Sequence, residues 1–394
     1  MPDDALTSAP TSIWEYVAPG EHRVPAAPVE QTVKAGLATL WRQLRPRPRE
    51  VDQPLTRDEV EALSDARLAT LAPEPEWTDA AGALDRALQE WLAHPTQAPH
   101  AVVTLGHPHS GHESVLRRWA QIRGWRVVRD PDEREILGAH ASWLSELAGD
   151  GAPWVLPALQ HCFLRHVDGL ALVRAALDGI NNGKLGHGII GCDTWAWAFL
   201  RHQWHGQGFP TLIAQAFDTD RLSTWFAQLA SAGGEHLVFR QPDTGRYVWP
   251  PRGEDGVPVS DYVRSLAVHS RGIPGVAWVT WRRSLVGTAR GPAGDGRAVT
   301  TVLVRAWADL RDLAVPADGE GEAALVLQAL LVHGGLPLDL VPLVTPLPAD
   351  EVAAIVSRLE GAELVTCTGG RYEVSALGYP AVRKLVAGRG FVTD

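Results

Sequence analysis

Lysine and methionine are almost missing from this chain. Lys34, Lys184 and Lys384 are the only lysines among 36 basic residues, all the others being arginine, and the one methionine is Met1. A phosphate site that depends on lysine therefore has just three residues to draw on.

Cysteine is scarce too. The three residues, Cys162, Cys192 and Cys367, are odd in number and far apart in the sequence. Their spacing excludes a disulfide framework and a C-x-x-C metal site. Each lies in an apolar stretch, so we expect all three to be buried, reduced side chains.

Long apolar runs are also missing. The longest, from Ala323 to Val344, is interrupted by polar residues, two glycines and a proline, unlike a membrane span. The amino terminus opens with an acidic pair, Asp3 and Asp4, and lacks the basic segment and apolar run of a secretory signal. We therefore expect a cytoplasmic protein without membrane insertion.

Acidic residues outnumber basic ones by 46 to 36, so the chain carries a formal net charge of -10. This balance argues against an extended basic surface that binds nucleic-acid phosphates. The chain has 394 residues, of which 45% are hydrophobic and 21% are charged, which predicts a globular protein with two or three domains.

Proline, glycine and the periodicity of apolar residues divide the chain into four predicted segments. Residues 1–77 form an Arg- and Pro-rich arm with helices expected over 33–43 and after Thr56. The next three segments are an α/β domain, a hairpin insertion with a helical lid, and a winged helix, over residues 78–235, 236–318 and 319–394.

Short apolar runs alternate with helical patterns in the α/β domain. The expected strands lie at residues 101–105, 125–130, 153–159, 186–195 and 209–217. The expected helices lie at residues 78–94, 115–122, 134–148, 164–180 and 221–229. This alternation predicts a parallel sheet with helices on both faces.

The rest of the chain has a different pattern. A hairpin around Gly245 is expected over residues 236–251 and is followed by two helices, a Gly-rich loop and a strand, at 259–270, 274–285, 287–297 and 300–307. The carboxyl-terminal elements are three helices, a hairpin at Gly369-Gly370 and a last helix, with the helices at 323–332, 338–344, 349–360 and 379–387. Three helices and a hairpin in this order predict a winged helix-turn-helix.

The segment from Gly106 to Ser114 follows the first expected strand and precedes a helix. Gly106 and Gly111 have the separation of the glycines in G-x-x-x-x-G-K-[ST]. In that setting, backbone N–H groups and the helix amino terminus form a cradle for anions. This region resembles the P-loop of AAA+ and STAND-type ATPases.

The order of later segments extends this resemblance over about residues 78–394. The run from Pro153 lies where these ATPases carry their Walker B acid, and the sensor-1 strand is matched by a run that ends in Asp193 and Thr194. Gly272 and Pro274 resemble the G-x-P element of a helical lid, which a winged helix commonly follows. The resemblance implies a parallel-sheet P-loop NTPase-like core.

The departures from that pattern concern its charged residues. His112 stands where the phosphate-binding lysine is expected, and Glu113 stands where the Mg²⁺-binding hydroxyl is expected; Ser114 fits only if the register slips by one residue. The Walker B run, residues 154–159, has no carboxylate. Because phosphoryl transfer depends on such charges, we expect no hydrolysis.

Three interpretations of the loop remain. In the first, the nucleotide site has decayed; in the second, ATP or ADP is still held by backbone contacts without turnover. In the third, the glycines merely permit a tight turn from strand to helix. Arg201 lies in the region where AAA+ proteins keep an arginine finger, and a solvated arginine at a helix end is the alternative.

Other chemistry has weaker support. Histidines gather near the loop and near Cys162 without the pattern of a known zinc module, at positions His100, His107, His109, His112, His161 and His166. Ser110 lacks a G-x-S-x-G elbow, so we reject serine-hydrolase chemistry. Trp278 and Trp281 share a helix face, which is typical of core packing, although some of the 16 tryptophans are expected to meet a partner.

The predicted winged helix has nine acidic and five basic residues, a net charge of -4. Its third helix offers few groups for base edges or phosphates, which favours a protein partner over DNA. We therefore expect a catalytically inactive adaptor or scaffold in a homo- or hetero-oligomer, without a resident cofactor or metal. The alternatives are a nucleotide-gated DNA-binding regulator or helper ATPase, and a weak NTPase completed by a neighbouring subunit.

Overall fold

The computed structural model describes residues 12–26, 61–94, 99–138, 140–206, 208–231, 235–250, 257–290, 299–317 and 319–391. Contacts divide them into two units. The first holds the described residues of Met1–His22, Glu76–Gly106 and Gly111–Gln215, and the second those of Arg23–Pro75, His107–Ser110 and Ala216–Asp394. The helices expected over 33–43 and after Thr56 lie outside the described residues.

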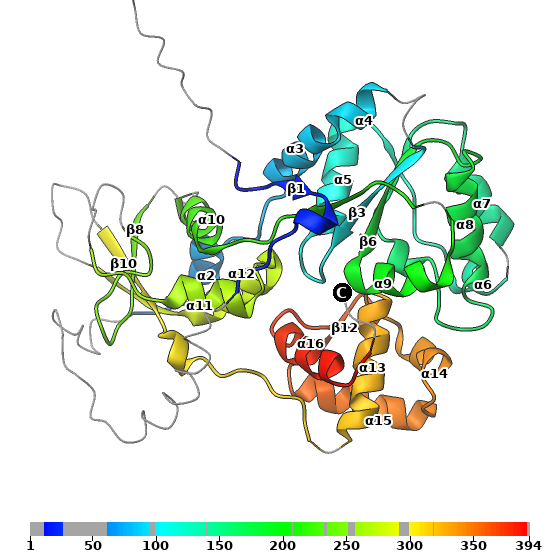
Figure 1. Ribbon diagram of the computed structural model, residues 1–394. Coiled ribbons are helices and arrows are strands. Elements are labelled where there is room, and N and C mark those ends of the chain that lie inside the picture. The colour runs from blue at the N-terminus through cyan, green and yellow to red at the C-terminus, as the bar shows by residue number, and fades with distance from the viewer. Residues whose placement is uncertain are drawn as a thin grey trace, which may run out of the picture. The chain divides into compact units, whose positions relative to one another are not determined.

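A six-stranded sheet forms the centre of the first unit, in the order β1-β7-β3-β6-β5-β4 (Figure 1). The strands are β1 Tyr16–Val17, β3 Ala101–Gly106, β4 Arg126–Val127, β5 Trp154–Leu156, β6 Gly188–Asp193 and β7 Thr211–Ala214. All neighbours pair in parallel except β1, which runs antiparallel to β7. The predicted α/β class with a parallel sheet is confirmed.

Helices cover both faces of this sheet. They are α3 Thr78–Ala87, α4 Gln89–Ala93, α5 His112–Arg123, α6 Glu133–Leu137, α7 His140–Ala148, α8 Ala171–Asn181 and α9 Thr194–Gln203, with short 3-10 turns η1 Pro19–Glu21 and η3 Leu159–His161. The connection from β3 to β4 crosses the sheet toward the β4 edge. The later connections, from β4 to β5, from β5 to β6 and from β6 to β7, run in the opposite direction. Because crossovers between parallel strands are right-handed, α5, with α3 packed on it, covers one face, and α7, α8 and α9 cover the other (Figure 1).

Several predicted elements of this unit differ from the structure. The helix expected over 78–94 is divided at Leu88 into α3 and α4. The helix expected over 134–148 is two helices, because Gly138 ends α6. The helix expected from Leu164 begins only at Ala171, since the chain first forms turns in which the Leu164 N–H donates to the Gly169 carbonyl. The fourth strand ends at Asp193, whose side chain caps α9 by accepting from the Trp195 N–H.

The second unit contains a four-stranded sheet in the order β2-β9-β10-β8. Its strands are β2 Glu61–Ala62, β8 His236–Arg240, β9 Leu285–Arg290 and β10 Val299–Val304. The expected hairpin is borne out in part: its turn at Gly245 is present, and the Val248 N–H donates to the Phe239 carbonyl across it, but the described residues after the turn form only isolated bridges. Along its length, β8 pairs in parallel with β10 instead. β9 begins at Leu285, the last residue of the helix expected over 274–285, and runs into the stretch expected to be a Gly-rich loop.

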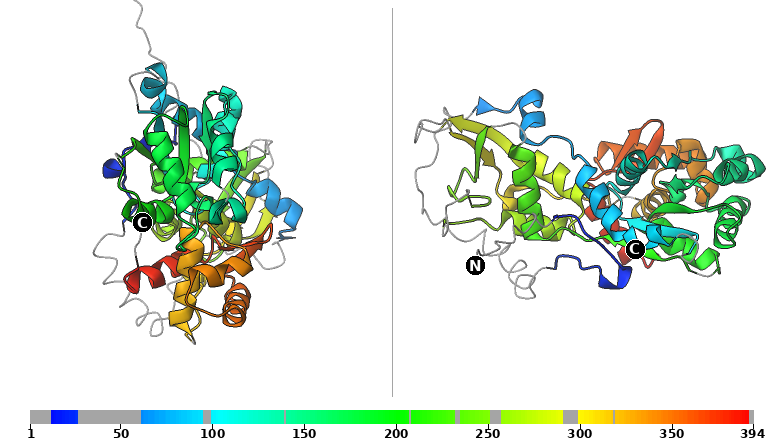
Figure 2. Two further views of the ribbon diagram at one scale, coloured as in Figure 1. Left: turned by 90° about the vertical axis from the view of Figure 1, so that its right-hand side faces the viewer. Right: turned by 90° about the horizontal axis from the view of Figure 1, so that it is seen from above.

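Helices pack beside this sheet, as Figures 1 and 2 show. They are α2 Asp65–Leu71, α10 Thr219–Ser231, α11 Tyr262–His269 and α12 Pro274–Ser284, followed by the 3-10 turn η4 Trp307–Asp309. Trp281 of α12 is 1% exposed and contacts the rings of Phe226, Phe239 and Trp249 at centroid distances of 5.1 to 5.3 Å. The core position predicted for Trp281 is confirmed, whereas Trp278 is half-buried.

The carboxyl-terminal elements have the expected order. They are α13 Glu320–Val332, η5 Leu338–Leu340, α14 Val341–Val344, α15 Ala349–Gly361, β11 Val365–Thr368, β12 Arg371–Val374 and α16 Tyr379–Gly388. Gly369 and Gly370 form the hairpin turn with positive φ angles, and Leu336 adds an isolated bridge to Tyr372. The assignment of these elements as a winged helix stays a prediction.

Burial corrects the expectation for one cysteine. Cys162 and Cys192 are buried, but Cys367 on β11 is exposed, because only Val365, the first residue of that strand, is covered and the three residues toward the hairpin turn are all exposed. Among the described residues no single helix has the length and composition to cross a membrane; segments 338–344 and 349–361 pass that test only together, across a bend of 117°.

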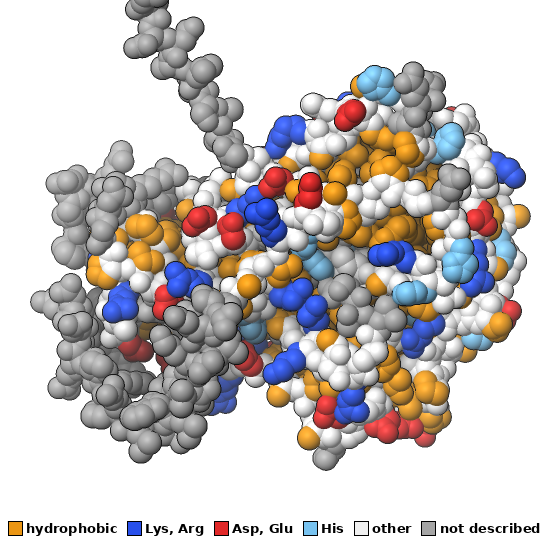
Figure 3. All heavy atoms as spheres, viewed as in Figure 1, with side chains coloured by type: hydrophobic (Ala, Val, Ile, Leu, Met, Phe, Trp, Pro, Cys, Tyr) orange, Lys and Arg blue, Asp and Glu red, His pale blue; other side chains and the backbone are white. Residues whose placement is uncertain are grey.

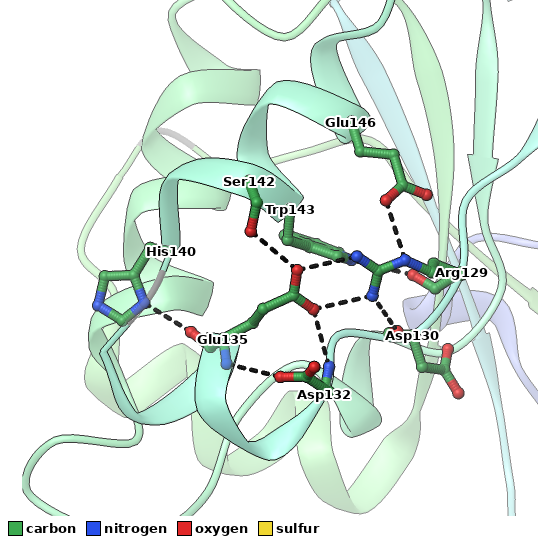
Figure 4. Close-up of polar contacts among 8 residues, drawn as sticks. All are labelled: Arg129, Asp130, Asp132, Glu135, His140, Ser142, Trp143 and Glu146. Carbon is green, nitrogen blue, oxygen red and sulfur yellow. Dashed lines mark hydrogen bonds and ion pairs between the residues drawn. The ribbon is translucent and has the colours of Figure 1, made fainter.

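A polar cluster fixes the chain after β4, as Figure 4 shows. Both Arg129 side-chain NH groups donate to the Glu135 carboxylate at 2.8 Å, and that carboxylate also accepts from the Asp132 N–H and the Ser142 hydroxyl. Glu135 is only 6% exposed. The hydrogen bonds from Arg129 lower the pKa of Glu135 to about 2, because their effect outweighs that of burial, which raises the pKa.

We predict that Glu135→Gln lowers the free energy of unfolding by about 1.5–3 kcal/mol near neutral pH, the range of a hydrogen bond to a charged group. The pKa of this carboxyl is depressed in the folded chain, so its contribution is complete above the ordinary value of 4.5 and is lost as pH falls toward 2. Urea denaturation at several pH values measures the difference. Glu146 also pairs with Arg129, at 2.9 Å, but is 41% exposed, so the control Glu146→Gln should cost less than about 1 kcal/mol; equal losses would contradict the prediction.

Candidate functional site

The carboxyl ends of β3 and β6 lie side by side at the centre of the first sheet. Gly106 is the register partner of Asp193. The chain leaves β3 toward β4 and leaves β6 in the opposite direction, toward β7. Such a reversal is where open parallel sheets bind ligands, in the crevice beyond the strand ends.

The two glycines lie at the two ends of the segment that connects β3 to α5. Gly106 ends β3, and Gly111, with a φ of 77°, precedes the first residue of α5. A Cβ on Gly106 would meet the His112 ring, and a Cβ on Gly111 would meet the Trp77 ring. Side chains of the protein itself therefore cover one face of each glycine.

Glu113 takes part in a hydrogen-bonded chain that crosses three strand ends. The Gln160 side-chain amide donates to the Glu113 carboxylate at 2.8 Å, and the Gln160 oxygen accepts from the Asp193 N–H at 3.1 Å. Gln160 is 1% exposed and lies on η3, directly after β5. A single amide thus joins the helix after β3 to the ends of β5 and β6.

Other predicted residues lie around this chain. Asp193 and Thr194 are buried at the start of α9, where Asp193 serves as its cap. Ser114 is exposed on the first turn of α5, so its hydroxyl is not part of the Gln160 contacts. Arg201 is exposed in the last turn of α9.

The end of β5 is apolar. All residues from Trp154 to Leu159 are buried, and the Pro157 carbonyl packs so closely on Gly191 of β6 that a Cβ there would clash. The next polar group is Gln160, an uncharged amide.

Residues 107–110 group with the second unit. Within it, the His109 carbonyl accepts from the Gly275 N–H at 2.9 Å, and His109 has a φ of 64°. Burial lowers the pKa of His109 to about 4, so its ring is uncharged at neutral pH and supplies no cation.

Gly272 and Pro274 also belong to the second unit. Gly272 has a φ of 70° and lies against the Phe217 backbone, which leaves no room for a side chain, and Pro274 is the first residue of α12. The described residues contain no cluster of three or more His, Cys, Asp or Glu side chains suited to a metal ion.

Sequence reasoning missed Gln160. A lone glutamine beyond an apolar strand carries no motif, and its importance comes from two partners, Glu113 and Asp193, that are distant in the sequence. The available signal was its place directly after the strand expected to carry the Walker B acid.

Comparison with known proteins finds distant structural neighbours. No family model and no curated protein matches the chain. The Walker-type ATPase of Pyrococcus abyssi aligns with 13% identity over 87% of this chain and 99% of that chain, with a TM-score of 0.26. The ORC2 protein of Aeropyrum pernix, solved as ADPNP–ADP complexes, aligns with 12% identity over 84% of this chain and 100% of that chain, with a TM-score of 0.31.

We predict that Gln160→Leu destabilises the chain by about 1–3 kcal/mol, because the buried Asp193 N–H loses its acceptor and Glu113 loses its donor. Chemical denaturation followed by circular dichroism measures the change. Gln121 is exposed on α5 and accepts from Arg118, so the matched control Gln121→Leu should stay within about 0.5 kcal/mol of the parent. A Gln160 variant as stable as this control would contradict the role of Gln160 as the buried link between Glu113 and Asp193.

Proposed function

We propose that this protein is a catalytically inactive relative of AAA+ and STAND-type ATPases that works as an adaptor or scaffold for protein partners. The observation that carries the proposal is the Glu113–Gln160–Asp193 chain, in which Glu113 at the expected Mg²⁺ position and Asp193 at the end of the expected sensor-1 strand both hydrogen-bond to Gln160. The Glu113 carboxylate and the Asp193 N–H, which an active site would offer to a ligand, are both bonded to Gln160 instead.

The charge of the loop supports this proposal. A P-loop needs a cation for the β- and γ-phosphates and a hydroxyl for Mg²⁺. Here the equivalent positions hold His112, whose ring lies on Gly106, and the carboxylate of Glu113. A carboxylate at this helix start repels phosphate oxygens, so the residues present do not fit a magnesium-bound triphosphate.

The end of β5 supports the same conclusion. Hydrolysis requires a carboxylate there to hold the metal or orient water. Buried apolar residues fill the strand, and Gln160 beyond it has no negative charge. We derive no hydrolytic step from these residues.

The carboxyl-terminal surface favours a protein partner over DNA. The exposed side chains of α15 include Asp350, Glu351 and Glu360 against the single cation Arg358. On the face drawn in Figure 3, acidic side chains gather over this part of the second unit. DNA-binding surfaces require the opposite sign of charge.

Two solution assays test inactivity and partner class. We expect no ATP turnover above a protein-free blank in a phosphate-release assay, and no duplex binding in a mobility-shift titration. ATP turnover that disappears in Glu113→Gln would refute the inactive state. Duplex binding that weakens steeply with salt would instead support the DNA-binding regulator.

We further predict that the double variant His112→Lys, Glu113→Thr gains ATP affinity by about tenfold or more over the parent, because it replaces a repelling charge by a phosphate ligand. Turnover should stay absent, since β5 still lacks a carboxylate. Equilibrium binding of a fluorescent ATP analogue measures the gain. The control Gln121→Lys adds the same charge on the exposed side of α5 and should bind as the parent does; an equal gain in both would contradict the prediction.

A further inference from the structure

The described part of the second unit contains a cavity of about 140 Å³ that none of the features above uses. Side chains from α11, α12 and the segment after β10 line it, including His269, Thr280, Arg283, Arg305, Trp307 and Arg311. At about 10–15 Å³ for each water position, it has room for on the order of ten water-sized groups. That space suits a small organic molecule.

Two of its arginines are unpaired. Within the part of the chain that the structure describes, neither Arg305 nor Arg311 has a side-chain hydrogen bond or an ion pair. Arg283 pairs with Glu363 at 3.0 Å, but 40% and 60% of these side chains are exposed, so the pair is weak. Guanidinium groups that converge on one cavity form forks suited to carboxylate or phosphate oxygens.

The charges that line the cavity are close to balance, which favours a ligand with one negative charge over one with several. Asp309 and Asp312 also line the cavity, and both are exposed. Burial lowers the pKa of His269, which outweighs the opposite effect of Asp312, so the ring is neutral at pH 7. Three arginines against two aspartates leave one net positive charge.

Trp307 supplies an apolar surface. Its ring is held edge-on by Tyr262 and His269, at centroid distances of 5.9 and 5.2 Å, and is half-buried. Such a fixed indole offers contact area at low entropic cost. The cavity therefore combines basic side chains with an apolar surface, a common composition of small-molecule sites.

We propose that this cavity binds a small molecule with one singly charged oxyanion, either a carboxylate or a phosphate ester, and a flat apolar part that packs on Trp307. Arg305 and Arg311 would donate to the oxyanion. This site is separate from the crevice at Gly106, so it does not depend on the proposed adaptor role.

Calorimetric titration of the full chain with two probes, benzoate and the diester methyl phenyl phosphate, tests this site and separates the two anion sources. We expect saturable 1:1 binding of at least one of them, and none of neutral benzamide. Arg305→Gln and Arg311→Gln should each weaken binding about tenfold, which is the effect expected from the loss of one charge-assisted hydrogen bond. Arg264 is exposed on α11 outside the cavity lining, so the control Arg264→Gln should leave the affinity unchanged.

The opposite results would overturn the proposal. It fails if neither anion binds at concentrations up to about 10 mM, because a dissociation constant above that value means only very weak binding. It also fails if benzamide competes equally with benzoate, or if both arginine variants bind as the parent does. Thermal melts show whether each variant remains folded, which is expected because the replaced side chains are exposed.

Discussion

Strands β3 and β6 pair in parallel over six residues, all of them buried, and this pairing positions every predicted residue of the first unit's site. It sets Gly106 opposite Asp193 and thereby joins the start of the loop to the start of α9. Both strands are nearly continuous apolar runs, as expected when helices cover both faces of a parallel sheet. The reversal of the connections at these strand ends marks the place where open parallel sheets bind ligands.

Beyond these ends the protein satisfies its buried polar groups from its own side chains. Buried N–H and carboxylate groups require partners, and Gln160 supplies one to Asp193 and one to Glu113. The same reasoning applies at the Arg129–Glu135 cluster, whose bonds hold the segment after β4. Asp130 of that segment accepts from His161 at 2.7 Å, which ties the cluster to the turn that carries Gln160.

Local patterns predicted the fold well where one strand or helix is complete in itself. The five parallel strands and the hairpin at Gly369-Gly370 follow from short apolar runs and from turn residues. The turn expected around Gly245 is present, but the sequence did not show that β8 pairs along its length with β10, some sixty residues later. Strand pairing at that distance leaves no mark in a local window. The helix expected from Leu164 is present only from Ala171, because the residues before it form turns.

The sequence by itself determined the parallel-sheet class, the strand–loop–helix around Gly106 and Gly111, and the absence of lysine from that loop. Those features depend on residue type and short spacing, which the chain displays directly. Only the tertiary structure decided that Gln160 joins Glu113 to Asp193, and that His269 and Arg283 line one cavity with Arg305 and Trp307. These groups meet because the strands and connections between them fold back on one another, and the spacing of residues along a chain does not encode that distance in space.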